Sequence, residues 1–351
     1  MRPEGIKRTD WINYNCLFVF EHFLGFRLFE KFFGVTRRNL FKKMDVYLKE
    51  SGRGENCEIK NVSKDITKEE FIEQCYNPVL PKIFKGAAKE WQVVKKWNLD
   101  FFEQYHGDKE VILNDNVGIT TQTFEKLDLK YYIKQLRSGS LKYLKFSDIV
   151  NDDENLKNDF DLKWLRRFNM RFSWAEDLKM FMGGKGTITP IHVGFSGFLF
   201  VQVMGKKKWI LYPPGERIFL DPRTERIFYY YSNANPYNTN DPDFPLLKYA
   251  KKYEVVLEPG DVLWVPPFTW HHVENHTDSI GIRYGRSSIP SSFKSSKMLT
   301  ILFFLATKPN IISHLYTSLR NKRSYEHIKS QSEIERSIFS RLNPFKKQHT
   351  E

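Results

Sequence analysis

A mainly β fold with flanking helices and a jelly-roll core is predicted by two features of the sequence. Short apolar runs follow one another at even spacing in the second half of the chain, with Gly and Pro turns between them, which is typical of an antiparallel barrel or jelly roll. Aromatic residues make up 16% of the 351 residues, and they suit the half-buried face of a sheet. The expected strands are 187–193, 198–204, 207–211, 253–257, 262–265 and 279–284.

Helices are expected on both sides of this β-rich part, which divides the chain into three regions. Residues 1–43 form an aromatic and basic helical segment, with one helix predicted over 11–33 because apolar residues cover most of its circumference. Residues 44–290 form the main domain, whose β core spans about 180–290. Residues 291–351 form a second basic helical segment that ends in a polar tail.

The first half of the main domain is predicted to be mostly helical. The sequence predicts helices over 65–77, 91–105, 123–137 and 145–168, and short strands at 78–84 and 111–114. A later stretch, 215–252, has little periodicity, and long irregular loops often act as lids. As a lid, it would line a substrate cavity with residues 228–231 and Tyr237. The alternative is that it packs against the barrel wall.

The net charge of +13 is concentrated at the two ends of the chain. Residues 1–43 hold nine Lys/Arg against four Asp/Glu, residues 291–351 hold eleven against four, and the middle carries only +1. A nucleic-acid groove in the core is therefore not expected. The basic ends suit a membrane surface or an acidic partner, or else a solvated surface that maintains solubility. We also expect residues 11–33 and 298–320 to pack together or across a homodimer.

Cysteine usage and hydropathy predict a cytoplasmic protein, at most peripheral to a membrane. Cys16, Cys57 and Cys75 show neither metal-binding nor disulfide spacing, which is typical of a reducing compartment. The sequence shows no signal-peptide pattern and no apolar run long enough to cross a bilayer.

Two histidines stand at strand ends in the β-rich half. His192 lies at the end of strand 187–193, and His271 follows strand 262–265 after a turn. A barrel can bring both imidazoles to one mouth. Single histidines are usually packed or surface residues, so the significance of this pair depends on the sequence around it.

Three segments resemble the Jumonji-C or cupin-like oxygenase family. Residues 183–214 (GGKGTITPIHVGFSGFLFVQVMGKKKWILYPP) resemble the first half of its core, and residues 257–275 (LEPGDVLWVPPFTWHHVEN) the second half. Residues 78–111 resemble the region that precedes this core. The resemblance extends over about 65–285 and is closest in pattern to the small hydroxylases of the family. It implies a double-stranded β-helix, or cupin fold, that binds Fe(II) and 2-oxoglutarate.

The resemblance assigns the metal and cosubstrate residues, with one departure. The family holds iron(II) with His-X-Asp/Glu and a distal His, here His192 and His271, but the carboxylate position is Gly194. Lys207, fifteen residues after the first His, would pair with the distal carboxylate of 2-oxoglutarate. Thr189, three residues before that His, would assist it.

Two further positions also differ from the family's hydroxylases. An Asn six residues after the first His is Phe198 here, and an Asn on the last strand falls near Arg283. An inward-pointing Arg283 would make the pocket more favourable for an anion.

The missing carboxylate leaves three functions open. Glycine has no Cβ, so its position has room for chloride, as in the iron/2-oxoglutarate halogenases that carry Ala or Gly there. The second is an atypical two-His hydroxylase, and the third is a catalytically inactive protein that binds a ligand or protein partner. The substrate would be a small molecule, a lipid-like molecule or a protein side chain.

Overall fold

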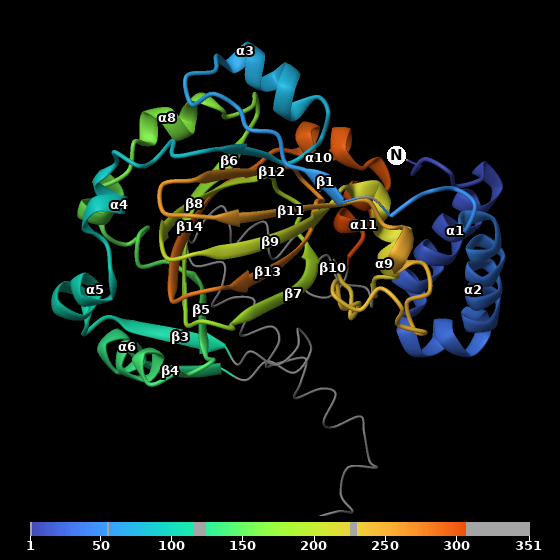
Figure 1. The fold of residues 1–351 in the computed structure, drawn as a ribbon, viewed down its shortest axis with the longest axis horizontal. Helices are drawn as coiled ribbons and strands as arrows, with labels where there is room; N and C mark the ends of the chain where they lie inside the picture. Colours follow the sequence, from blue (N-terminus) through green and yellow to red (C-terminus); the bar gives the residue numbers. More distant parts are fainter. Residues whose placement is uncertain (1, 55, 115–123, 225–229, 307–351) are drawn as a thin grey trace, which may run out of the picture.

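The computed structural model describes residues 2–54, 56–114, 124–224 and 230–306. In this part of the chain two large, mostly antiparallel sheets face each other, and helices surround them (Figure 1). The predicted mainly β fold with a jelly-roll core is confirmed.

The first sheet has six strands and carries most of the predicted site. All of its neighbouring strands are antiparallel except the parallel pair β1–β11. In spatial order it contains β1 (Asn56–Glu58), β11 (Lys252–Leu257), β9 (Lys207–Tyr212), β13 (Trp270–Asn275), β7 (Ile188–Val193) and β10 (Tyr230–Tyr231).

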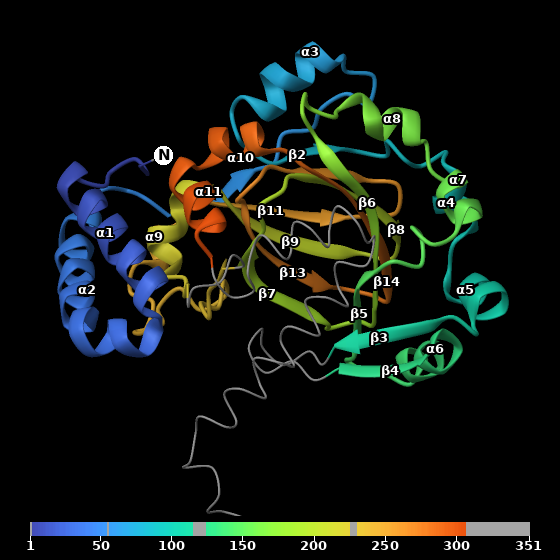
Figure 2. The ribbon, with the colours of Figure 1, turned by 180° about the vertical axis from the view of Figure 1, so that it is seen from behind.

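The second sheet has eight strands and closes the other side of the barrel (Figure 2). Its long central pair, β14 and β6, runs antiparallel across the back of the core. In spatial order it contains β2 (Lys82–Phe84), β12 (Val262–Val265), β8 (Phe198–Met204), β14 (Ser279–Ser287), β6 (Trp174–Gly183), β5 (Tyr143–Ser147), β3 (Glu110–Asn114) and β4 (Phe124–Asp128).

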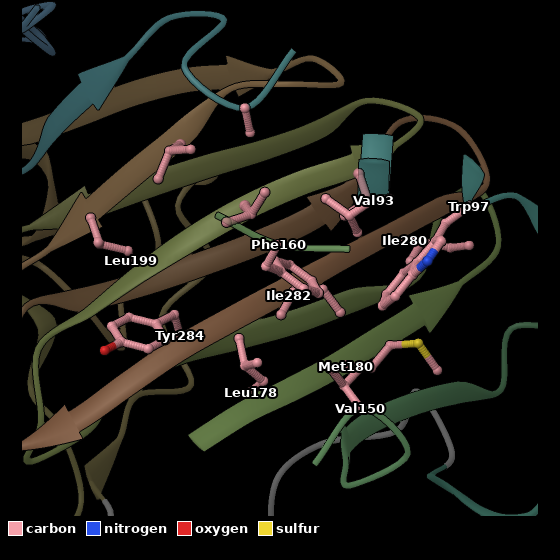
Figure 3. Packing of buried hydrophobic residues seen from close by; sticks show 14 of the residues in the cluster. Val93, Trp97, Val150, Phe160, Leu178, Met180, Leu199, Ile280, Ile282 and Tyr284 are labelled. Carbon is pink, nitrogen blue, oxygen red and sulfur yellow. The ribbon is translucent and has the colours of Figure 1, made fainter. Parts of the chain in front are cut away.

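Alternation along the strands separates the barrel interior from two outer cores. On β8, Phe198 and Phe200 belong to the interior cluster, while Leu199 and Val201 belong to the cluster on the outer face. Figure 3 shows part of that outer cluster, where Val93 and Trp97 pack over side chains of β6, β8 and β14. The helices on this face are α3 (Lys68–Phe71), α4 (Gln92–Lys96), α5 (Leu99–His106), α6 (Leu129–Arg137), α7 (Glu154–Asn158) and α8 (Leu162–Arg167).

The other outer face, on the six-stranded sheet, packs against the two ends of the described chain. Ile191 and Val193 of β7 share one buried cluster with Phe18 near the N-terminus and Leu302 near the C-terminus. The helices here are α1 (Arg8–Leu24), α2 (Phe26–Leu48), α9 (Arg217–Leu220), α10 (Ile289–Ser295) and α11 (Lys297–Phe304). The expected neighbourhood of the two ends is therefore seen within one chain up to residue 306, and the rest of 298–320 lies outside the described residues.

Several predicted elements are wrong. The single helix 11–33 is two helices, because Gly25 adopts φ +77° and turns the chain between α1 and α2. The predicted helix 123–137 begins as strand β4, and 145–168 begins inside strand β5 before the short helices α7 and α8. Strands β6 and β13 were not predicted.

The described part of stretch 215–252 packs against the barrel wall. Leu220 and Tyr230 are buried in the cluster that includes α1 and α2. The Tyr237 hydroxyl donates to Glu274 at 2.8 Å, and its ring meets His272 rather than His271. Residues 228 and 229 of the predicted lid lie outside the described residues.

Candidate metal and cosubstrate site

The two predicted metal ligands lie directly opposite each other on neighbouring strands. His192 of β7 and His271 of β13 are register partners in an antiparallel pair. Residues paired in this way point to the same face of a sheet, and the two ring centroids are 4.1 Å apart. Both residues are 6% exposed. The fold therefore brings together two imidazoles that are 79 residues apart in the sequence.

Backbone carbonyls fix the tautomer of both rings. The Nδ1 atom of His192 lies 2.8 Å from the Pro190 carbonyl oxygen, and Nδ1 of His271 lies 2.9 Å from that of Thr269. A carbonyl only accepts, so Nδ1 carries the hydrogen and Nε2 keeps the lone pair that a metal needs.

Burial keeps both imidazoles neutral. It lowers the pKa of His271 to about 4. Burial, followed by the repulsion that a protonated His271 would exert, lowers the pKa of His192 well below its usual value. Neutral imidazole is the form that binds metal ions. Among the described residues, the pair thus meets the electronic requirement for two ligands of an iron(II) ion.

The neighbouring histidine points the other way. The His272 ring meets the edge of Tyr237 on the outer side of the sheet, whereas the His271 ring lies 5.6 Å from Trp209, an interior residue. Strand alternation therefore allows only one of the two adjacent histidines to join His192.

A third protein ligand is missing from the described part of the chain. No group of three or more His, Cys, Asp or Glu there is placed to hold a metal ion. A Cβ built on Gly194 would meet no other atom within 4 Å. The position of the expected carboxylate is therefore open space, and the residues present fit a metal with two protein ligands.

A β-bulge places Thr189 on the same face as His192. His271 pairs with His192 and Val273 pairs with Thr189, so two steps on β13 match three steps on β7. The extra residue in β7 shifts the alternation of side chains by one, so the residue three positions before His192 faces the same side of the sheet as His192. Val273 belongs to the interior cluster, so its partner Thr189 also faces the interior.

Lys207 lies completely buried inside the barrel. Its Nζ donates to the Tyr143 hydroxyl at 3.0 Å and stands 5.1 Å from the Phe200 ring centroid. Burial, assisted by the charge of Lys145, lowers its pKa to about 7. In the described part of the chain, no carboxylate forms an ion pair with Lys207. A buried ammonium group with a hydroxyl beside it is a suitable partner for a carboxylate ligand.

Two other interior cations are neutralised by aspartates. Arg283 faces inward over the Phe198 ring, and it forms an ion pair with Asp177 at 2.7 Å. Lys179 forms an ion pair with Asp148. Arg283 does point inward, but Asp177 compensates the charge that would have attracted an anion.

Sequence reasoning missed Tyr143 and Lys145, both on β5. Tyr143 contacts Lys207, and Lys145 is 6% exposed in the interior. The segment lies about fifty residues before the metal motif and was interpreted as the approach to a helix. The alternation in Tyr-Leu-Lys was the only local indication of a strand. Because a lysine in such a pattern usually faces solvent, the alternation indicated a surface segment.

These features define a double-stranded β-helix whose interior brings together two histidines and a buried lysine that has no carboxylate partner among the described residues. The family profile described as "Cupin-like domain" matches residues 67–285, and the chain belongs to this family.

Similar proteins include one that is named as an oxygenase. Jumonji C domain-containing protein 5 of Drosophila melanogaster is 23% identical over 65% of this chain and 60% of its own length. The 2-oxoglutarate and iron-dependent oxygenase JMJD4 of Mus musculus is 28% identical over 61% of this chain and 57% of its own length. The tRNA wybutosine-synthesizing protein 5 of Mus musculus is 25% identical over 65% of this chain and 78% of its own length.

None of the described helices is long and apolar enough to cross a membrane.

Proposed function

We propose that this protein is an Fe(II)/2-oxoglutarate-dependent oxygenase-type enzyme that acts on an aliphatic C–H bond. The observation that carries the proposal is the pair of neutral imidazoles opposed at 4.1 Å on the same inner wall as buried Lys207. His192 and His271 would hold the iron, and Lys207 with Tyr143 would hold the distal carboxylate of 2-oxoglutarate. When bound, iron(II) and 2-oxoglutarate would activate dioxygen, which is the oxidant, and so supply chemistry that amino-acid side chains lack.

The residues of the barrel would orient the cosubstrate and exclude water. Phe198, Phe200 and Trp209 form an apolar wall around the histidines and Lys207. Such a wall keeps competing water away from the reacting centre and strengthens the ion pair between Lys207 and a carboxylate. Thr189 lies on the same inner face as His192, and its hydroxyl would assist Lys207 at the end of the pocket that binds 2-oxoglutarate.

Two reactions differ in what occupies the space beside Gly194. Chloride there would make the protein a halogenase, and it would restore the negative charge lost with the carboxylate. Water there would make it a two-His hydroxylase. The open space around a Gly194 Cβ supports room for either occupant.

Chloride linkage and Gly194→Asp separate these two reactions. For a halogenase, chloride should tighten 2-oxoglutarate binding. By thermodynamic reciprocity, 2-oxoglutarate should then tighten chloride binding by the same factor. For a hydroxylase, chloride should compete or have no effect. Gly194→Asp should end any halogenation and raise iron affinity, since it supplies a third ligand where there is space.

A catalytically inactive binding protein is the alternative. It predicts that neither iron nor chloride changes ligand binding. The buried lysines indicate an anionic ligand in either case, because each unpaired buried charge destabilises the fold, so iron dependence is what separates the two functions.

We also propose that the hairpin of α1 and α2 contacts an anionic membrane surface. Its exposed apolar side chains are spaced three and four residues apart on α2, which forms a stripe along one helix face. Arg27 and Lys31 are exposed beside this stripe, a pairing of apolar and basic groups that suits the interface of an anionic bilayer. The stripe consists of Leu28, Phe32 and Val35, which are between 48% and 65% exposed, and Phe20 and Phe23 of α1 are each 47% exposed.

A further inference from the structure

Lys145 is a second buried cation in the barrel without a carboxylate partner among the described residues. Its side chain comes from β5, which lies between β6 and β3 in the eight-stranded sheet (Figure 2). The Nζ atom stands 5.0 Å from the centroid of the Tyr143 ring. The same ring contacts Lys207, whose Nζ is 5.5 Å from the centroid. The Nζ atoms of both lysines therefore lie close to the same aromatic ring.

The charges of the described interior do not balance. Lys179 and Arg283 each have an aspartate, whereas Lys145 and Lys207 have none. The distal carboxylate of 2-oxoglutarate would neutralise Lys207. Its other carboxylate would be used at the metal, where the missing carboxylate at Gly194 already leaves an excess of positive charge. Lys145 therefore remains as an uncompensated cation after both cofactors are in place.

Lys145 is also close enough to act on both ends of the site. Its charge lowers the pKa of His192 at the metal end and of Lys207 at the cosubstrate end. Burial lowers the pKa of Lys145 itself to about 8, so at neutral pH most of the side chain is still charged. A group in this position can meet a substrate that approaches the metal.

We propose that Lys145 is a substrate-binding residue, and that the substrate carries a carboxylate or phosphate group close to the C–H bond that reacts. This inference rests on the proposed oxygenase function and narrows its substrate class to anions. An anionic oxygen on Lys145 would form a charge-assisted hydrogen bond in an apolar surrounding, where such bonds are strongest. The same cation would disfavour a neutral or cationic substrate, since neither would compensate its buried charge.

Binding of small probes to the parent and to two variants tests the inference. The probes are butyrate, propyl phosphate and neutral butyramide, titrated calorimetrically into protein that holds 2-oxoglutarate and, anaerobically, Fe(II). Lys145→Met removes the ammonium group at similar length, and Lys145→Arg retains the positive charge. We expect the parent to prefer one of the two anions over butyramide by about tenfold or more. The preference should disappear in Lys145→Met and persist in Lys145→Arg.

The titration with 2-oxoglutarate separates the possible failures. Lys145→Met should keep its 2-oxoglutarate affinity within about twofold, whereas Lys207→Met should lose about tenfold or more. If Lys145→Met loses as much as Lys207→Met, Lys145 belongs to the cosubstrate site and the inference is wrong. Equal or absent binding of all three probes by the parent also overturns it. If the parent fails to bind 2-oxoglutarate, the proposed oxygenase function fails, and the probe comparison in metal-free protein still decides whether Lys145 selects anions.

Discussion

Replacing Lys207 by methionine should make the ligand-free protein more stable while weakening its binding of 2-oxoglutarate. The pKa of this lysine is about 7, against 10.5 for an exposed lysine, because burial disfavours the charged form. That difference corresponds to about 5 kcal/mol of unfavourable burial. The lost hydrogen bond to Tyr143 offsets about 1 kcal/mol of the gain. We therefore expect a net stabilisation of about 2–4 kcal/mol at pH 7, allowing for relaxation around the charge in the parent.

The pH dependence of unfolding gives the same prediction a second readout. Between pH 7 and about 10 the unfolded chain binds a proton at Lys207 that the folded chain has released, so the stability of the parent rises with pH. Lys145 contributes in the same direction above about pH 8. In Lys207→Met the free energy of unfolding should rise less with pH, because the contribution of Lys207 is absent.

The assay is urea unfolding at pH 7 and pH 9, followed by calorimetric titration with 2-oxoglutarate. Affinity should fall by one to two orders of magnitude, because a charge-assisted contact is worth about 1.5–3 kcal/mol. Lys206→Met is the matched control, since Lys206 is exposed and pairs with Glu258 on the surface. A Lys207→Met protein that is less stable than the parent and binds 2-oxoglutarate equally well would refute the reasoning.

Three other changes test the remaining parts of the site and surface. His192→Ala and His271→Ala should each abolish measurable iron(II) binding in an anaerobic titration. Replacing the outward-facing His272 by Ala should leave iron(II) binding unchanged. Normal iron(II) binding by His192→Ala or His271→Ala would mean that the ligands are misassigned. Gly194→Asp should raise iron(II) affinity about tenfold or more, and an unchanged affinity would show that this position does not face the metal. Phe32→Ser should reduce sedimentation with phosphatidylserine vesicles, while Phe172→Ser, at an equally exposed site elsewhere, should not. Equal sedimentation of both variants and the parent would contradict the membrane contact.

Sequence periodicity located the strands that contain short apolar runs. Strands β7, β8, β12 and most of β9, β11 and β14 fall where such runs predicted them. Strands β5, β6 and β13 were missed because charged or polar residues point inward from them. On β6, for example, Asp177 and Lys179 face the interior and pair with other interior residues. Such a strand has the polarity pattern of a surface segment, and only its tertiary partners show that it is buried.

The candidate site likewise contains residues that the sequence identified and residues that it did not. The resemblance of one segment to the oxygenase family was enough to propose His192, Thr189 and Lys207, and the structure places all three on one inner wall. Tyr143 and Lys145 come from a strand far away in the sequence, so no local spacing links them to the motif. The ion pair between Arg283 and Asp177 also depends on tertiary structure, because the register of β14 against β6 sets it.

The most direct test of the central claim is whether iron(II) and 2-oxoglutarate bind cooperatively at the opposed histidines. Calorimetric titration of 2-oxoglutarate under anaerobic conditions, with and without Fe(II), measures this in the parent and in His192→Ala. The account predicts that Fe(II) tightens 2-oxoglutarate binding by about tenfold or more in the parent and has no effect in the variant. Binding of 2-oxoglutarate that is absent, or that is the same with and without iron in the parent, would contradict it.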